Sequence, residues 1–312
     1  MPLRGPERSL YGALSTIILH DISPDGSVLV GEGLHERDVA FIGDGAISPR
    51  SLAWHERDFF ARLSPDGRLA LVSGWDPRAK VVAMLRKTTG AAPQLLGEGF
   101  GADLSADGRT ALLVWGDVLT LAATDAERRR NVRLPDFEIS QTRFAGGTDR
   151  AISIARARSD TGFRLHSVDL HSGATAPISE EGVEQDSLEV SPGARWVAAT
   201  TTVDGKKVPV IVPLSGGKAS TLSELGPDLT PAGWATDEEL WLARLEEGDA
   251  SSFGLIRYDV RRRIALEKRT IDAGGNASVH GVHITPDGKA VVFIQQRRVG
   301  HLYVVRGLGR GR

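Results

Sequence analysis

The five residues Leu63-Ser-Pro-Asp-Gly67 decide the fold, because they return along the chain with little change. The same pattern stands at Ile22–Gly26, Leu104–Gly108 and Ile284–Gly288. Proline fixes φ, aspartate hydrogen-bonds nearby backbone, and glycine accepts a positive φ, so each copy predicts a tight turn. A large apolar residue precedes every turn and a short apolar run follows it, which is the pattern of two strands joined by a turn.

Three weaker copies fill the gap before the last of these turns, at Phe144–Asp149, Val190–Arg195 and Trp234–Glu238. The aspartate or its equivalent falls at positions 25, 66, 107, 149, 193, 237 and 287, so the repeat is about 41 to 50 residues long. Repeats of roughly 40–45 residues made of short strands are typical of four-stranded propeller blades. The sequence therefore predicts an all-β protein, a single β-propeller of seven four-stranded antiparallel blades, with six blades as the alternative.

We expect one propeller domain over 1–312, with blades that start near residues 19, 60, 101, 141, 187, 231 and 281. The last unit ends after its third strand, whereas the strand-like residues 1–14 have no unit of their own. Residues 1–14 are therefore expected to supply the fourth strand of the last blade and to close the ring, which removes an unpaired edge. Residues 307–312 are expected to be a flexible basic tail.

Composition excludes several classes of protein. Lys and Arg number 38 against 40 Asp and Glu, a net charge of −2, which argues against nucleic-acid partners held through phosphates. Without cysteine the chain has no disulfide, thiolate metal site or cysteine nucleophile. No apolar run reaches about 18 residues and no signal-peptide shape is present, so we expect no membrane insertion by this chain. The localisation stays open: cytoplasmic if Met1 is the natural start, or outside the cytoplasm if the chain is part of a longer receptor.

The repeated unit, an apolar residue, Ser-Pro-Asp-Gly, a basic residue and an apolar run, resembles the repeat of TolB-like, WD40-like β-propellers. Leu19–Gly26 and Gly300–Leu308 are most similar to the two ends of the C-terminal propeller of bacterial eukaryotic-like Ser/Thr protein kinases. The resemblance covers nearly the whole chain. It implies a scaffold that binds a protein or peptide, as a free-standing module or as the sensor domain of a kinase-like protein.

The catalytic motifs of the related enzymes are missing. The sequence has no His-Arg-Asp or Asp-Phe-Gly of a kinase and no Gly-x-Ser-x-Gly of a serine peptidase. His280 and His283 are three apart in an expected strand and so face opposite ways, which argues against a metal site. We therefore expect a protein that is not an enzyme and has no catalytic residue, metal or cofactor. The alternatives are an accessory propeller that gates a peptidase or hydrolase, and a hydrolase of the calcium-dependent lactonase type.

One position carries charge around most of the expected ring. It is the residue just before the apolar one that introduces each turn, on the innermost strand, and its sign alternates through the first five units. We predict that these residues line the central channel and that acids and bases of neighbouring blades pair. Two interpretations stay open, a structural role and a site for a polar ligand or a peptide terminus at the channel mouth. The residues are Asp21, Arg62, Asp103, Arg143, Glu189, Gly233 and His283, of which all but Gly233 are candidates for ligand binding.

A second set of candidates lies on expected loops at the rim. His-Glu-Arg-Asp occurs twice, at 35–38 and 55–58, and Trp54 and Trp75 lie near predicted turns. Aromatic side chains at loop tips are frequent in binding surfaces, whereas solvated turns with local ion pairs are the alternative. We name His35, Trp54, His55 and Trp75 as rim candidates for a protein or peptide partner of a monomeric domain.

Overall fold

The computed structural model describes residues 16–55, 58–245 and 250–306. These residues form twenty-four strands and one short 3-10 helix, Ser223–Leu225, so the all-β prediction is confirmed. The chain divides into two compact units, a larger one of Arg37–Gln296 and a smaller one of Met1–Glu36 with Arg297–Arg312. No helix in the described part of the chain has the length and hydropathy needed to cross a membrane.

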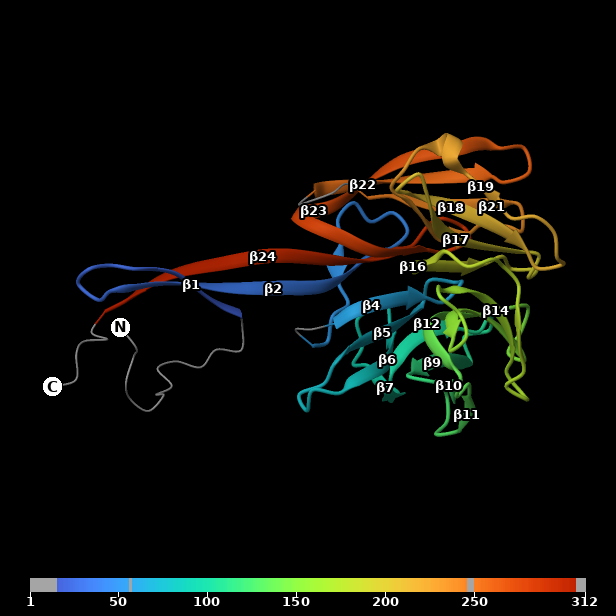
Figure 1. Ribbon diagram of the computed structural model, residues 1–312, viewed down its shortest axis with the longest axis horizontal. Coiled ribbons are helices and arrows are strands. Elements are labelled where there is room, and N and C mark those ends of the chain that lie inside the picture. The colour runs from blue at the N-terminus through green and yellow to red at the C-terminus, as the bar shows by residue number, and fades with distance from the viewer. Residues whose placement is uncertain (1–15, 56–57, 246–249, 307–312) are drawn as a thin grey trace. The chain divides into compact units, whose positions relative to one another are not determined.

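Four blades of the larger unit are separate four-stranded antiparallel sheets (Figure 1). Their strands are β4 (Asp58–Leu63), β5 (Leu69–Trp75), β6 (Val81–Lys87) and β7 (Gln94–Glu98); β8 (Phe100–Leu104), β9 (Thr110–Trp115), β10 (Val118–Ala123) and β11 (Arg129–Arg133); β12 (Phe137–Phe144), β13 (Arg150–Ala157), β14 (Arg164–Asp169) and β15 (Thr175–Pro177); and β16 (Val183–Val190), β17 (Trp196–Val203), β18 (Lys206–Pro213) and β19 (Ser220–Thr221).

The remaining eight strands share one sheet, in the order β1-β2-β24-β23-β22-β21-β20, with β3 paired to β2. They are β1 (Thr16–Ile22), β2 (Val28–Ile42), β3 (Arg50–Ser51), β20 (Leu229–Trp234), β21 (Glu239–Arg244), β22 (Ala250–Asp259), β23 (Ile264–Ile284) and β24 (Val291–Val305). The long strand β23 belongs to two blades, because its residues up to Ala277 pair with β22 and those from Ser278 onward pair with β24. The fifth blade is thus β20–β23, and the sixth combines the end of β23 with β24, β2 and β3.

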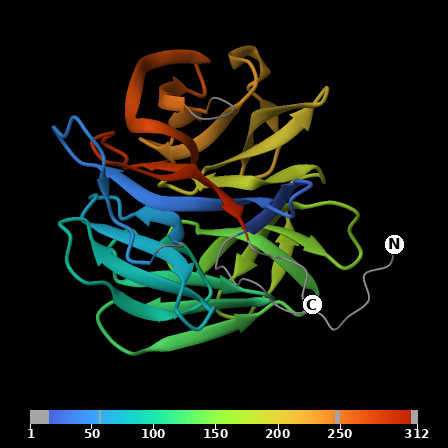
Figure 2. The same cartoon turned by 90° about the vertical axis from the view of Figure 1, so that its left-hand side faces the viewer.

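The innermost strands neighbour one another in the cyclic order β4, β8, β12, β16, β20 and β23, which leads back to β4. Figure 2 lets the reader follow the blades of the larger unit around this ring, from blue-green through green and yellow to orange. The predicted propeller of four-stranded antiparallel blades is confirmed, and within Arg37–Gln296 the pairing gives the alternative count of six. Strands β2 and β3, from the N-terminal part of the chain, close the ring. Residues 1–14 and 307–312, to which a closing strand and a tail were assigned, lie outside the described residues.

The repeated turns form as their chemistry predicts. In the first blade the Ser64 hydroxyl donates to Asp66 Oδ1 at 2.6 Å, and the same oxygen accepts from the Arg68 backbone N–H at 3.1 Å. Gly67 has φ of 68°, which a residue with a side chain adopts rarely. The Ser64 hydroxyl holds the pKa of Asp66 below its ordinary value.

The first of the seven repeats serves a different purpose. Its residues Ser23–Gly26 turn the chain between β1 and β2 in the smaller unit, with Gly26 at φ of 85°. The other six copies turn the chain between the first and second strands of the six blades. Apolar side chains between neighbouring blades make up the core. Val39 and Phe41 of β2 pack with Met84 of the first blade and Val292 of β24, so the sixth blade packs against the first.

Candidate functional site

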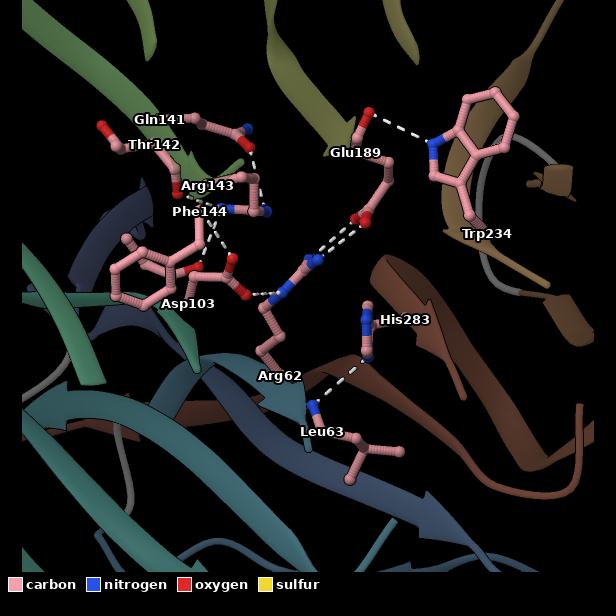
Figure 3. A network of polar contacts seen from close by, with 11 residues as sticks. Arg62, Leu63, Asp103, Gln141, Thr142, Arg143, Phe144, Glu189, Trp234 and His283 are labelled. Carbon is pink, nitrogen blue, oxygen red and sulfur yellow. Dashed lines mark hydrogen bonds and ion pairs between the residues drawn. The ribbon is translucent and has the colours of Figure 1, made fainter. Parts of the chain in front are cut away.

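A buried ion network lies where the innermost strands reach the Asp-Gly turns (Figure 3). Arg62, on β4, donates from Nε to Asp103 Oδ1 at 2.6 Å, on the neighbouring β8. Its two terminal nitrogens donate to the two oxygens of Glu189, each at 2.7 Å. Glu189 is on β16, three blades away in a ring of six and therefore on the opposite side. Arg62 thus connects the two sides of the channel, in addition to the neighbour pairing that the alternating signs predict.

The two acids of the network have their oxygens occupied. The second oxygen of Asp103 accepts from the Phe144 backbone N–H at 2.9 Å, and the Glu189 backbone carbonyl accepts from Trp234 Nε1 at 3.2 Å. Burial by itself would lower the pKa of Arg62, but Glu189 and Asp103 together outweigh it and raise that pKa above its ordinary value. The two carboxylates therefore hold Arg62 in its charged form.

Arg143, on β12, lies beside the network without a carboxylate of its own. It donates from one terminal nitrogen to the carbonyls of Ala102 and Thr142, at 2.8 and 2.9 Å, and from the other to Gln141 Oε1 at 3.2 Å. Its Nε is buried without a hydrogen-bond partner in the described structure. Burial, reinforced by the charge of Arg62, lowers the pKa of Arg143 to about 10.

The last two ring positions are not charged. His283, on β23, accepts at Nδ1 from the Leu63 backbone N–H at 3.2 Å, which requires the neutral ring. Burial first, and then Arg62 and Arg143, place the pKa of His283 well below its ordinary value. At Gly233, on β20, a Cβ atom would stand 2.6 Å from the Ile284 carbonyl oxygen, so no side chain fits between these two strands.

The structure brings Arg62, Asp103, Arg143, Glu189 and His283 together and buries all five. Asp21 does not join them, since it is an exposed residue of β1 in the smaller unit and accepts from the next backbone N–H. Linked side chains span the channel here and have almost no contact with solvent. The network therefore links blades on opposite sides of the channel. A ligand-binding role for this ring stays a prediction.

The rim candidates are placed differently from one another. Trp54 is exposed, and its ring lies 5.7 Å from the guanidinium of Arg86. The backbone N–H groups of Trp54 and His55 donate to Asp58 Oδ2, at 2.6 and 3.1 Å, so this turn is organised by a buried carboxylate. His35 is in β2, outside the residues whose side chains are described.

Trp75 belongs to a row of four aromatic side chains, which we call the aromatic row. The ring of Phe59 lies 6.4 Å from that of Trp75 and 5.6 Å from that of Phe100, and Phe100 stacks on Trp115 at 5.9 Å. Trp75, Phe100 and Trp115 are 40, 42 and 51% exposed. Phe59 and Phe100 stand at the start of β4 and β8, and the tryptophans stand at the end of β5 and β9. The row therefore crosses two blades at the end opposite the ion network.

Sequence reasoning found Trp75 and missed Phe59, Phe100 and Trp115. A signal was present, because Phe59 and Phe100 are one repeat apart, three residues before Arg62 and Asp103. At the same place the other four blades carry Ser140, Asp186, Thr230 and His280. The aromatic row is thus a property of two blades and not of the repeat.

The described residues contain no group of three His, Cys, Asp or Glu that could hold a metal ion. No protein-family model matches the sequence. No curated protein matches it either.

Solved structures do match. A TolB protein of Agrobacterium tumefaciens, described as putative, is 13% identical with a TM-score of 0.63, over 85% of this chain and 100% of that one. TolB of Acinetobacter baumannii is 11% identical with a TM-score of 0.56, over 77% of this chain and 65% of that one. A chain of a nidogen/laminin complex is 9% identical with a TM-score of 0.51, over 74% of this chain and 92% of that one. The link to the kinase propellers gains no support from these similarities.

Enzymes also share the fold, which corrects one expectation. Hydrazine synthase of Kuenenia stuttgartiensis is 14% identical with a TM-score of 0.52, over 92% of this chain and 94% of that one. The inference that this chain is not an enzyme was wrong, because it rested on missing kinase and peptidase motifs while propellers of this fold occur in enzymes of other kinds. At these identities the similarity establishes architecture alone, and the chain has the fold of the TolB-like β-propellers.

Proposed function

We propose that the protein is a binding module that holds a protein or peptide segment on the aromatic row. The observation that carries the proposal is the exposure of Trp75, Phe100 and Trp115 in one row of ring contacts, which Phe59 completes. Large aromatic side chains are normally buried, and where they are exposed together they supply most of the binding energy of protein interfaces. Their rings restrain one another, so little side-chain entropy is lost when a partner covers them.

Two further observations favour the aromatic row, rather than the central channel, as the binding site. The charged ring at the other end of the inner strands is buried, and its donors and acceptors are mostly used within the protein. The row also interrupts the repeat, since the third, fourth and fifth blades carry Ser140, Asp186 and Thr230 where Phe59 and Phe100 stand. A feature present in two blades only is not required to build a blade. The nidogen/laminin match adds that a propeller of this fold occurs in a complex between proteins.

The test is a selection of peptides from a phage-displayed random library on the immobilised protein. Phe100→Ala/Trp115→Ala removes the centre and one end of the row, and Trp54→Ala is the matched control, because Trp54 is exposed but outside the row. We expect selected peptides to bind the double variant at least about tenfold more weakly than the parent, as truncation of hot-spot residues does. The control should bind like the parent.

Two outcomes would contradict the proposal. Peptides that bind the parent and the double variant equally would place binding elsewhere. A selection that enriches no peptide over the bare support would show that this surface is not a peptide site.

A further inference from the structure

The two tryptophans at the ends of the aromatic row have unused hydrogen-bond donors. Trp75 and Trp115 are exposed, and no residue in the described part of the chain accepts a hydrogen bond from their indole N–H groups, in contrast to the buried Trp234, which donates to the Glu189 carbonyl. An exposed tryptophan offers an apolar ring and a donor side by side. A partner that suits both ends of the row therefore brings apolar surface together with hydrogen-bond acceptors.

The rings of the row are inclined to one another. From Trp75 along the row to Trp115, the planes of consecutive rings meet at 51, 63 and 28°. Nucleobases and sugar rings stack flat on an aromatic face, so a chain of them is best served by faces in one plane. Inclined rings instead give a ridged surface. The compact rings of proline pack against such ridges in the aromatic-lined surfaces that bind proline-rich segments.

The length of the row suits a short segment in the polyproline II conformation. The three centroid distances of 6.4, 5.6 and 5.9 Å place the outer rings no more than about 18 Å apart, and a polyproline II helix rises about 3.1 Å per residue, so about six residues span the row. The backbone carbonyls of this helix make no internal hydrogen bonds. They are therefore available as acceptors for the two indole N–H groups.

The charge of the surface and the composition of the chain narrow the partner further. The aromatic row contains no charged side chain, and the net charge of −2 argues against a nucleic acid that stacks its bases here. An uncharged apolar segment with free carbonyls complements such a row. The closest of the 15 prolines of this chain are four residues apart, so it contains no Pro-x-x-Pro of its own. The partner segment therefore lies outside these 312 residues.

We infer that the aromatic row binds a proline-rich segment of another polypeptide in the polyproline II conformation. Proline rings pack against the four aromatic rings, and backbone carbonyls of the segment accept hydrogen bonds from the indole N–H groups of Trp75 and Trp115. Because proline fixes the segment in advance, little conformational entropy is lost on binding. This inference rests on the proposed function, since it names the kind of peptide that the row holds.

Isothermal titration calorimetry of the full chain with an acetylated and amidated decaproline tests this inference. The control peptide is a decamer of alternating glycine and serine, which has the same length and behaves as a flexible coil. We expect decaproline to bind at least about tenfold more tightly than the control peptide. Cellohexaose, a chain of six sugar rings, is the third probe, and we expect it not to bind.

Substitutions by phenylalanine separate the indole donors from the rings. Trp75→Phe and Trp115→Phe keep a ring at each end of the row and remove the N–H. Each should weaken decaproline binding about fivefold, as the loss of one hydrogen bond does. Trp54→Phe is the matched control, because it makes the same change at an exposed tryptophan outside the row. Far-UV circular dichroism checks that every variant is folded.

Three results would overturn the inference: decaproline that binds no more tightly than the control peptide, phenylalanine variants that both bind decaproline like the parent, or cellohexaose that binds the parent but not Phe100→Ala/Trp115→Ala. The last result would assign the row to a glycan. Failure here is separable from failure of the proposed function. Library peptides that depend on the row but lack proline would contradict the proline-rich partner alone, whereas library peptides that bind the double variant like the parent would contradict both.

Discussion

The strands β4 and β8 carry opposite chemistries at their two ends. At the end beside the Asp-Gly turns, Arg62 and Asp103 are charged and buried. Three residues earlier, Phe59 and Phe100 belong to a row of aromatic rings that is about half exposed. This is the reverse of the usual distribution of charged and apolar side chains. The buried charges pair with one another, so their role is to stabilise the fold. The aromatic rings contact one another but stay partly open to solvent, which is why we assign binding to them.

The largest effect is expected at the buried end. Glu189→Ala removes the bidentate partner of Arg62 and leaves a buried cation with one carboxylate. Breaking a buried ion pair from one side costs about 3–5 kcal/mol, so we expect Tm to fall by roughly 6–20 °C. Differential scanning calorimetry measures the change. Glu238→Ala, which breaks an exposed pair with Arg261, is the control and should cost about 1 kcal/mol or less.

A smaller loss is expected where the ring has no side chain. Gly233→Ala places a Cβ 2.6 Å from the Ile284 carbonyl oxygen at a φ of 154°. The strands β20 and β23 must separate slightly, and strain of this kind costs about 1–3 kcal/mol. Urea unfolding gives the value, with Gly300→Ala as the control because a Cβ there meets nothing within 4 Å. Equal stability of the two variants would mean that β20 and β23 can separate at Gly233 without a measurable cost in free energy.

His283 should make the buried end sensitive to acid. Its pKa in the folded protein lies well below the value of about 6.5 in the unfolded chain. As the pH falls below about 6.5, His283 becomes protonated in the unfolded chain but stays neutral in the folded protein. The free energy of unfolding therefore declines by up to about 1.4 kcal/mol per pH unit. His283→Asn keeps an acceptor for the Leu63 N–H and cannot titrate. Urea unfolding between pH 7 and pH 5 should show a shallower decline in this variant; an unchanged slope would mean that other groups cause the loss.

The smallest effect is expected at the exposed end. Phe100→Ala and Trp115→Ala remove rings that are half in solvent, so each should change the free energy of unfolding by about 1 kcal/mol or less. The two substitutions combined are expected to weaken peptide binding at least about tenfold. Thermal unfolding measured beside binding tests the contrast directly. A loss as large as that of Glu189→Ala would show that the aromatic row holds the blades together and would remove the reason to assign it to a partner.

The fold could be predicted because each turn encodes its own geometry. Ser64, Asp66 and Gly67 make the hydrogen bonds and the positive φ that the sequence predicts. The blade count was harder, since Ser23–Gly26 has the same local chemistry and forms the same turn. What differs is burial. Leu63 before the second turn is buried and Ile22 before the first is exposed, and burial is a property of the assembled ring that no local pattern contains.

The candidate site was predicted in part for a related reason. Alternating charges correctly brought Arg62 beside Asp103, because neighbouring blades follow from chain order. They did not predict the contact of Arg62 with Glu189, which requires the number of blades to be known, since only in a ring of six are β4 and β16 opposite. Tryptophans near predicted turns identified one residue of the aromatic row, Trp75, whereas the 41-residue spacing of Phe59 and Phe100 was the better signal.

The closing blade has a consequence for synthesis of the protein. Strands β2 and β3 leave the ribosome well before β24, the strand that pairs with β2. Until then Val39 and Phe41, which end up buried, lack the β24 side chains that cover them. The nascent chain therefore carries an unpaired apolar edge until β24 has been made, and completion of the ring is a long-range step that a holding chaperone would be expected to protect.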